Sequence, residues 1–145
     1  MALSETIKKL INNAWDDGYP CLLATTGPAG PNISPKGSML VFDDGHLAYW
    51  ERSKKVALEN LGHDRRVTVI YANFKCQHDR VLESGFLRFW GTTEMHETGP
   101  IRDAIFAKLT KREQERGLAL AVLRVEWLFP CDQLRDPGRV AARRS

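Results

Sequence analysis

The turn Asp43-Asp44-Gly45 separates two apolar runs of this chain, at residues 32–42 and 46–51. An Asp-Gly turn between two such runs is typical of a β-hairpin. Similar short runs recur along the chain between polar or glycine-rich breaks, and none approaches the roughly 18 residues of a membrane-spanning helix. The pattern favours a fold of short antiparallel strands and predicts no association with a membrane.

This spacing predicts six strands, with one helix before them and further helices between them. The strands are expected at residues 21–25, 32–42, 46–51, 66–74, 85–96 and 118–129, and the helices at residues 4–15 and 54–61, from residue 98 and from residue 110. Residues 75–82 are expected to form a polar connection. Pro35 has no N–H group to offer a sheet, so it must lie in an edge strand or at a bulge. Because six antiparallel strands can remove their edges by closing on themselves, we expect a mainly β fold, a six-stranded barrel with helices on its outside.

The composition is ordinary for one globular domain, with 43% hydrophobic and 27% charged residues in a chain of 145. We expect this domain to cover residues 1–137 and to be followed by a basic, disordered tail at residues 138–145. The net charge is +3, and three of the 21 basic residues are arginines of that tail, so the rest of the chain balances 18 basic against 18 acidic residues. A neutral body lacks the broad basic face of a nucleic-acid-binding protein, so no such partner is expected.

Cysteine usage bears on the cellular compartment. The three cysteines, Cys21, Cys76 and Cys131, lie far apart, and the first residues show no apolar leader segment. The pattern predicts reduced thiols and a cytoplasmic location. The four histidines are scattered at spacings that do not suit zinc, so no metal site is expected. No Gly-x-Ser-x-Gly motif marks a nucleophile, and the sequence assigns no catalytic residue.

A cluster of cations indicates a binding site. Arg52, Ser53, Lys54 and Lys55 follow the predicted third strand and open the predicted helix at residues 54–61. Cations at a helix N-terminus oppose the helix dipole, which favours anions there, so the cluster indicates a site for a phosphate. The segment at residues 34–38 adds a further cation, a hydroxyl and a glycine that allows the backbone to approach a ligand closely. The alternative is an ordinary solvated basic face.

Four segments in this order resemble the pyridoxamine 5'-phosphate oxidase-like family of flavin-binding split barrels. They are residues 30–38 (GPNISPKGS), 49–55 (YWERSKK), 57–71 (from ALENL to RVTVIY) and 85–94 (GFLRFWGTTE). The resemblance covers residues 3–128, most of the chain. It implies a split β-barrel that forms a homodimer, with FMN bound in a groove at the interface between the two copies.

The resemblance also implies roles for individual residues. The FMN phosphate would be held by the cluster Arg52, Ser53, Lys54 and Lys55, with help from Lys36. The backbone of Gly37, Ser38 and Met39 would run beside the isoalloxazine ring. Trp50 and Trp90 would line the ring or the neighbouring substrate space. The alternative for each tryptophan is a place in the core or in the dimer interface, because aromatic side chains bury large areas whatever the function.

The implied function is that of an FMN-dependent oxidoreductase, acting on a small-molecule substrate through flavin N5. The chain ends without the Arg-x-His segment that grips pyridoxal phosphate in the true oxidase, so oxidation of vitamin B6 is not expected. Two alternatives remain. One is a non-catalytic flavin-binding or sensor protein. The other is a relative that holds a deazaflavin or haem on the same barrel, with His78 or His96 as the axial ligand of the haem.

Overall fold

The structure is a computed structural model that describes residues 3–52, 56–116 and 121–129, the last range by its backbone alone. Within these ranges, no helix has both the length and the apolar character needed to cross a membrane. The expected tail at residues 138–145 lies outside the described residues.

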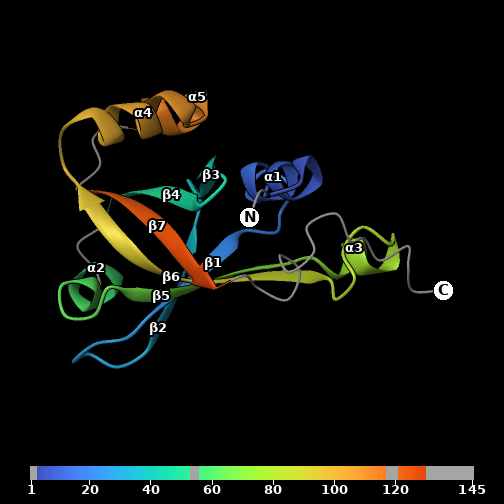
Figure 1. Cartoon of the computed structure of the whole chain (residues 1–145), viewed down its shortest axis with the longest axis horizontal. Coiled ribbons are helices and arrows are strands. Elements are labelled where there is room, and N and C mark those ends of the chain that lie inside the picture. Colours follow the sequence, from blue (N-terminus) through green and yellow to red (C-terminus); the bar gives the residue numbers. More distant parts are fainter. Residues whose placement is uncertain (1–2, 53–55, 117–120, 130–145) are drawn as a thin grey trace.

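Seven strands form one antiparallel sheet (Figure 1). In chain order they are β1 (Cys21–Thr25), β2 (Asn32–Lys36), β3 (Leu40–Asp43), β4 (His46–Glu51), β5 (Arg66–Ala72), β6 (Phe86–His96) and β7 (Ala121–Phe129). Their order across the sheet is β2-β1-β5-β6-β7-β4-β3, and every neighbouring pair is antiparallel. The expectation of a mainly β, antiparallel fold with a few flanking helices is confirmed. The expected number of six strands is wrong, because residues 32–42 form two strands instead of one.

The two halves of that segment lie at opposite edges of the sheet. β2 and β3 follow one another in the chain, yet each pairs with only one described strand, so the sheet is not closed into the expected barrel. The three residues between β2 and β3 allow four Cα steps of 3.8 Å, or at most about 15 Å. The sheet must therefore curl until its edges nearly meet, and residues 37–39 bridge the split. Pro35 lies in the edge strand β2, as expected.

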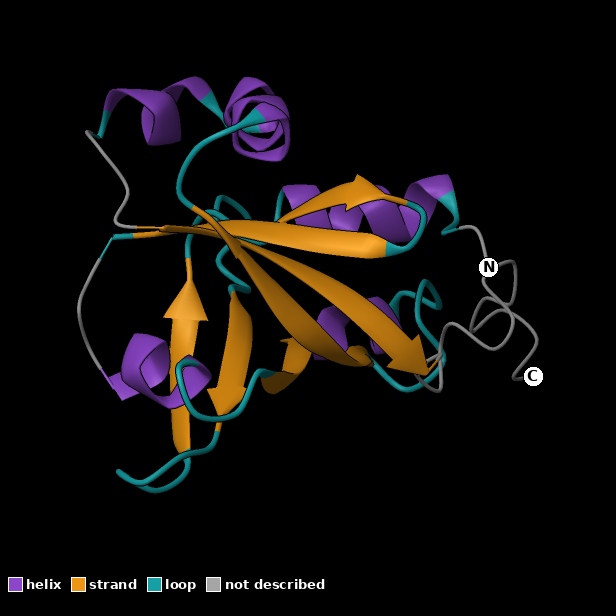
Figure 2. Ribbon diagram, turned by 60° about the vertical axis from the view of Figure 1, so that its left-hand side comes forward, coloured by secondary structure: helices purple, strands orange, loops and turns teal. Residues whose placement is uncertain are grey.

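Five helices flank the described sheet (Figure 2). They are α1 (Glu5–Asn12), α2 (Val56–Leu61), α3 (Phe74–His78), α4 (Pro100–Lys108) and α5 (Lys111–Glu115). α1 begins where Ser4 Oγ accepts a hydrogen bond from Ile7 N–H at 3.2 Å, and it buries Ile7 and Ile11. α3 corrects the expected polar connection at residues 75–82, because Cys76 and Leu82 are buried in the core and anchor a helical turn.

Two hydrophobic cores lie on opposite faces of β4. Leu47 and Tyr49 belong to the large core that α1 covers. Ala48 and Trp50 belong to a smaller core that includes Ile105 of α4. Since successive side chains of a strand point to opposite faces, β4 is buried on both sides. Its end, followed by Arg52, is thereby held rigidly beside the split between the sheet edges.

Candidate functional site

Residues 37–39, which bridge the split, are bonded to the end of β4 through Ser38. Its side chain is 7% exposed. The hydroxyl accepts a hydrogen bond from Trp50 N–H at 2.8 Å and donates one to the Trp50 carbonyl at 3.2 Å. Two of the predicted site residues are thus in direct contact. Because the Ser38 hydroxyl is occupied by the backbone, a ligand beside residues 37–39 would meet their main chain first.

Lys36 and Glu51 form an ion pair between the ends of β2 and β4. Lys36 Nζ lies 2.9 Å from Glu51 Oε2, and the two side chains are 11% and 4% exposed. Lys36 Nζ also lies 5.2 Å from the centre of the Tyr49 ring. Burial, with Glu51 nearby, raises the pKa of Tyr49 well above its ordinary value, so the Tyr49 hydroxyl is neutral. The predicted phosphate helper Lys36 is therefore already paired with a buried carboxylate in this protomer.

Arg52 is paired with the buried carboxylate of Glu113 on α5. Its guanidinium donates to Glu113 Oε2 and to the Glu113 backbone carbonyl. Arg112 and Arg116 approach Glu113 Oε1 at 3.3 and 3.4 Å. Arg112 also pairs with Asp16 at 3.0 Å, so three guanidinium groups meet two carboxylates and the cluster keeps one excess positive charge. The other predicted phosphate ligands, Ser53, Lys54 and Lys55, lie outside the described residues.

The two tryptophans singled out by the sequence occupy different environments. Trp50 is 4% exposed and packs beneath α4, with its ring 5.6 Å from that of Phe106 and 4.9 Å from the Arg102 guanidinium. Its indole N–H is buried without a hydrogen-bond partner among the described residues. Trp90 is half-buried and packs against the large core. The role of either ring toward a cofactor stays a prediction.

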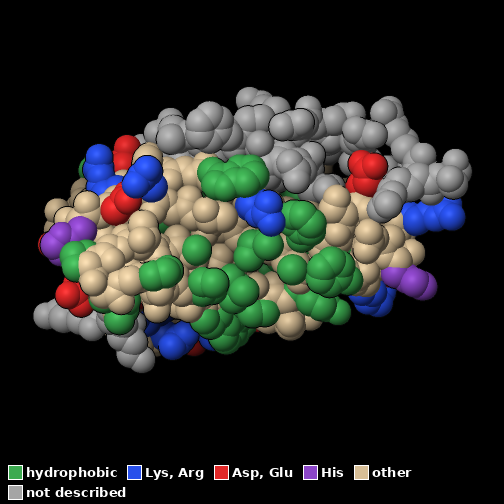
Figure 3. Space-filling model, turned by 90° about the horizontal axis from the view of Figure 1, so that it is seen from below, with side chains coloured by type: hydrophobic (Ala, Val, Ile, Leu, Met, Phe, Trp, Pro, Cys, Tyr) green, Lys and Arg blue, Asp and Glu red, His purple; other side chains and the backbone are tan. Residues whose placement is uncertain are grey.

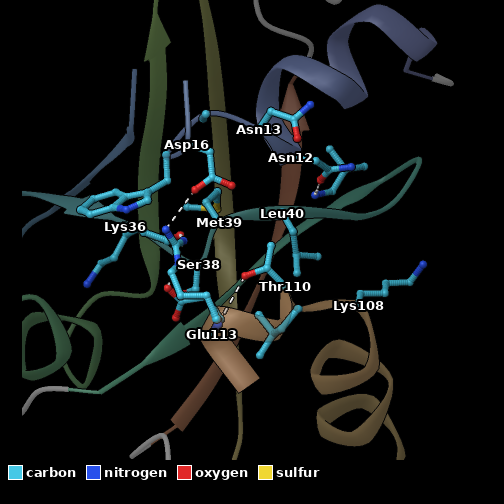
Figure 4. Close-up of a pocket in the computed structure, with 16 residues that line it drawn as sticks. Asn12, Asn13, Asp16, Lys36, Ser38, Met39, Leu40, Lys108, Thr110 and Glu113 are labelled. Atoms are coloured by element: carbon cyan, nitrogen blue, oxygen red, sulfur yellow. Dashed lines mark hydrogen bonds and ion pairs between the residues drawn. The ribbon is translucent and has the colours of Figure 1, made fainter. Parts of the chain in front are cut away.

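A cavity of about 280 Å³ lies where the end of α1 and the start of α5 approach residues 36–41 (Figure 4). Four predicted site residues line it, namely Lys36, Gly37, Ser38 and Met39. The sequence did not indicate the residues on the helical side, which include Asn12, Asn13, Asp16, Lys108, Thr110, Arg112 and Glu113. The one signal was the capping pattern from Thr110 to Glu113. Thr110 Oγ does accept from Glu113 N–H at 3.3 Å, but the Glu113 carboxylate turns to Arg52.

On the sheet half formed by β2, β1, β5 and β6, the residues that alternate with the buried core residues form a second face, and of these residues Trp90 also packs against the large core. Opposed residues of antiparallel strands share a face. One cross-strand row on this face is Pro35, Leu22, Ile70 and Arg88, and the next is Ile33, Ala24, Thr68 and Trp90. Ala72 and Phe86 extend it. We call these ten residues the outer face. Ile33 is 68% exposed. Figure 3 shows hydrophobic side chains gathered on the underside of the molecule around a basic one.

A family model described as pyridoxamine 5'-phosphate oxidase matches residues 4–130 of the chain. The chain belongs to this family. The match spans all seven strands of the sheet, including the split at residues 37–39. The resemblance drawn from the four sequence segments is confirmed.

Solved structures share the fold of this pyridoxamine 5'-phosphate oxidase family member. HupZ of Group A Streptococcus is 25% identical, with 86% of this chain and 89% of that chain covered and a TM-score of 0.67. HutZ, a haem storage protein from Vibrio cholerae, is 16% identical, with 90% and 96% covered and a TM-score of 0.61. An F420 reductase is 14% identical, with 84% and 93% covered and a TM-score of 0.57. No curated protein sequence matches the chain.

Proposed function

We propose that the chain is an FMN-binding oxidoreductase that works as a homodimer. The observation that carries this proposal is the meeting of the sheet edges at residues 37–39. Residues 37–39, which are expected to contact the flavin ring, lie against the end of β4. The segment expected to bind the phosphate begins there, at Arg52. This convergence occurs in a chain that belongs to the pyridoxamine 5'-phosphate oxidase family.

The described residues suit the two ends of FMN. At the phosphate end, the three charges of Arg52, Arg112 and Arg116 exceed the two negative charges of Glu113 and Asp16, which leaves one positive charge toward a dianion. Arg52 leads directly into Ser53, Lys54 and Lys55, which would complete the phosphate site. At the ring end, the backbone of residues 37–39 would offer hydrogen bonds to the polar edge. The bound flavin would supply reversible hydride acceptance at N5.

A second copy of the chain is needed to complete this site. The cavity of about 280 Å³ falls below the roughly 300–1,000 Å³ of pockets for drug-sized ligands. The outer face is a largely apolar, partly exposed surface on which Ile33, Pro35 and Ala72 are exposed, and exposed apolar surfaces mark sites of association. Two-fold dimers bury the same patch on both subunits. We infer that two copies associate through the outer face. None of its ten residues lines the cavity, but Pro35 directly precedes Lys36 of the lining, so the groove for FMN would be formed where this edge meets the second copy.

Two alternatives concern this site: a haem in place of the flavin, and a protein that binds the cofactor without catalysis. HutZ, with a similar fold, is a haem storage protein. Neither of the two histidines considered as haem ligands lines the cavity, because His78 is 90% exposed beside Asp79 and His96 is bonded to Glu94 at 3.1 Å. The described site therefore favours a flavin. No described side chain of the site stands out as an acid or base, so the substrate would react with the flavin directly.

The test begins with the purified full-length chain. We expect yellow protein, FMN by mass spectrometry of the released cofactor, and loss of flavin absorbance when NAD(P)H is added without oxygen. Protein that binds FMN but is inert to reductants would be a flavin-binding or sensor protein. Colourless protein that does not take up added FMN would overturn the proposal. A haem or deazaflavin spectrum would assign the barrel to another cofactor.

The phosphate site is tested at the two lysines, because Arg52 also carries a structural ion pair. Lys54→Gln with Lys55→Gln should weaken FMN binding by about 10-fold or more, the worth of one charge-assisted hydrogen bond. The matched control is Lys9→Gln with Lys75→Gln, two exposed lysines on α1 and α3. Equal affinity in both double variants would place the phosphate elsewhere.

A further inference from the structure

Arg88 is the one charged residue of the outer face. It lies opposite Ile70 in the pairing of β5 with β6, in the row that continues through Leu22 to Pro35. Its neighbours on the same face of β6 are Phe86 and Trp90. Among the described residues, no carboxylate lies within ion-pair reach of the Arg88 guanidinium. A cation in the middle of an apolar face needs an explanation, because such faces normally exclude charge.

Two aromatic rings fix the position of this guanidinium. The central carbon of Arg88 lies 5.1 Å from the centre of the Phe86 ring and 5.5 Å from that of the Trp90 ring. Both distances suit cation–π attraction, which holds the group without using its N–H donors. An arginine fork held in this way matches the two oxygens of a carboxylate and can bind them with two parallel hydrogen bonds.

The residues around Arg88 on the outer face supply no counter-charge. Apart from Arg88, the outer face holds apolar side chains and Thr68. When two copies pack through this face, each arginine leaves water and meets no acidic residue of the other outer face. A buried cation without a partner is strongly unfavourable. The acidic residues of the same sheet face, Glu94 on β6 and Glu126 opposite Thr92, belong to rows beyond Trp90. A carboxylate brought by a ligand between the copies would meet the guanidinium directly.

We propose that Arg88 binds the carboxylate of a flat organic acid whose apolar body rests on the Trp90 and Phe86 side of the outer face. This inference rests on the proposed function for the placement of the second copy, and it names the substrate class of that enzyme. Ile70, Leu22 and Pro35 continue the apolar surface across three further strands. An aromatic or fused-ring carboxylate fits this surface, whereas a sugar or an ammonium compound does not.

The experiment uses the protein as purified, with whatever cofactor it carries, and two probes of equal shape. 2-Naphthoate carries the carboxylate, and 2-naphthamide is its neutral counterpart. Binding is followed by calorimetry and by quenching of tryptophan fluorescence. We expect naphthoate to bind at least about 10-fold more tightly than naphthamide. This difference in affinity corresponds to one charge-assisted hydrogen bond. Arg88→Gln should remove this preference and leave naphthamide affinity unchanged. Arg88→Lys, which keeps the charge and loses the fork, should restore it only in part.

Arg66→Gln is the matched control, because Arg66 is an exposed arginine of β5 that is paired with Asp64. It should keep the full preference for naphthoate. Three results would overturn the inference: no binding of naphthoate, equal binding of the two probes, or a preference that survives in Arg88→Gln. Flavin content and molar mass are measured on every sample. Wild-type protein without FMN would count against the proposed function, while the naphthoate preference would still be measured independently of it.

Discussion

Arg52, at the end of β4, is bound to Glu113, 61 positions later on α5. The guanidinium donates both to the Glu113 carboxylate and to the Glu113 backbone carbonyl. The Glu113 side chain is 2% exposed, and that of Arg52 is 19% exposed. This contact ties the helical segment that follows β6 to the residue directly before the expected phosphate-binding segment. Glu113 is thus placed to influence both the stability of the fold and the position of the site.

Replacing Glu113 should destabilise the protein strongly. Glu113→Ala leaves Arg52, Arg112 and Arg116 close together without their shared carboxylate. Removing one partner of a buried ion pair typically costs about 3–5 kcal/mol in the free energy of unfolding. Urea denaturation followed by fluorescence measures this loss. Glu115→Ala on the same helix is the control, because its pair with Lys111 is exposed at 3.9 Å and should contribute less than about 1 kcal/mol. Similar losses in the two variants would contradict a structural role for the cluster.

Two serines on either side of Lys36 should respond differently to loss of the hydroxyl. Ser38→Ala removes both hydrogen bonds to the Trp50 backbone and should cost about 1–3 kcal/mol, because buried polar groups are left unpaired. The Ser34 hydroxyl is buried with no partner among the described residues, so Ser34→Ala should be close to neutral. Thermal unfolding of both variants provides the comparison. A larger loss of thermal stability in Ser34→Ala than in Ser38→Ala would refute the conclusion that the Ser38 hydroxyl holds residues 37–39 in place.

Cys21 should make the fold sensitive to alkali. Burial raises the pKa of its thiol to about 12, from an ordinary value of 9.0. The folded state therefore disfavours the thiolate. This contribution to stability is fully present below about pH 9 and is lost as the pH rises from there toward 12. Urea denaturation at pH 8 and pH 10.5 should show a smaller decline for Cys21→Ala than for the wild type. Parallel declines would mean that the Cys21 thiol ionises as readily in the folded state as in the unfolded state.

The outer face should control the oligomeric state. Ile33 is 68% exposed in one protomer, so Ile33→Glu should leave the protomer folded while it places a charge in the proposed interface. Light scattering coupled to size-exclusion chromatography should show a dimer for the wild type and a monomer for this variant. Met95→Glu, at an exposed position outside the outer face, is the control and should remain dimeric. A monomeric wild type, or an unchanged dimer in Ile33→Glu, would exclude the outer face as the interface.

Local patterns predicted the elements that depend on neighbouring residues. Ser4 and Thr110 cap the helices that follow them, and Asp43 and His46 face each other across the expected hairpin turn. The sequence did not predict the break in residues 32–42. Gly37 and Ser38 are compatible both with the interior of a strand and with a turn. Their role as a bridge depends on the curl of the whole sheet. The helix α3 was missed because Cys76 and Leu82 are too few apolar residues to form a periodic pattern.

The site was predictable in part. The resemblance selected Lys36, Gly37, Ser38 and Met39, and the structure brings these four to one cavity. It could not show that Lys36 and Arg52 are paired with Glu51 and Glu113, because such partners are chosen by the tertiary fold. Arg88 gave no signal in the sequence, since an arginine within a strand is unremarkable until its neighbours on the same face are known.

β7 is the only described strand that joins the two halves of the sheet, since it pairs with β6 on one side and β4 on the other. It is also the last of the described strands in chain order. During synthesis, the hairpin of β3 and β4 has one edge of β4 unpaired until residues 121–129 have emerged from the ribosome. Exposed strand edges invite pairing with other chains, so the nascent protein passes through a stage in which chaperone protection would matter most.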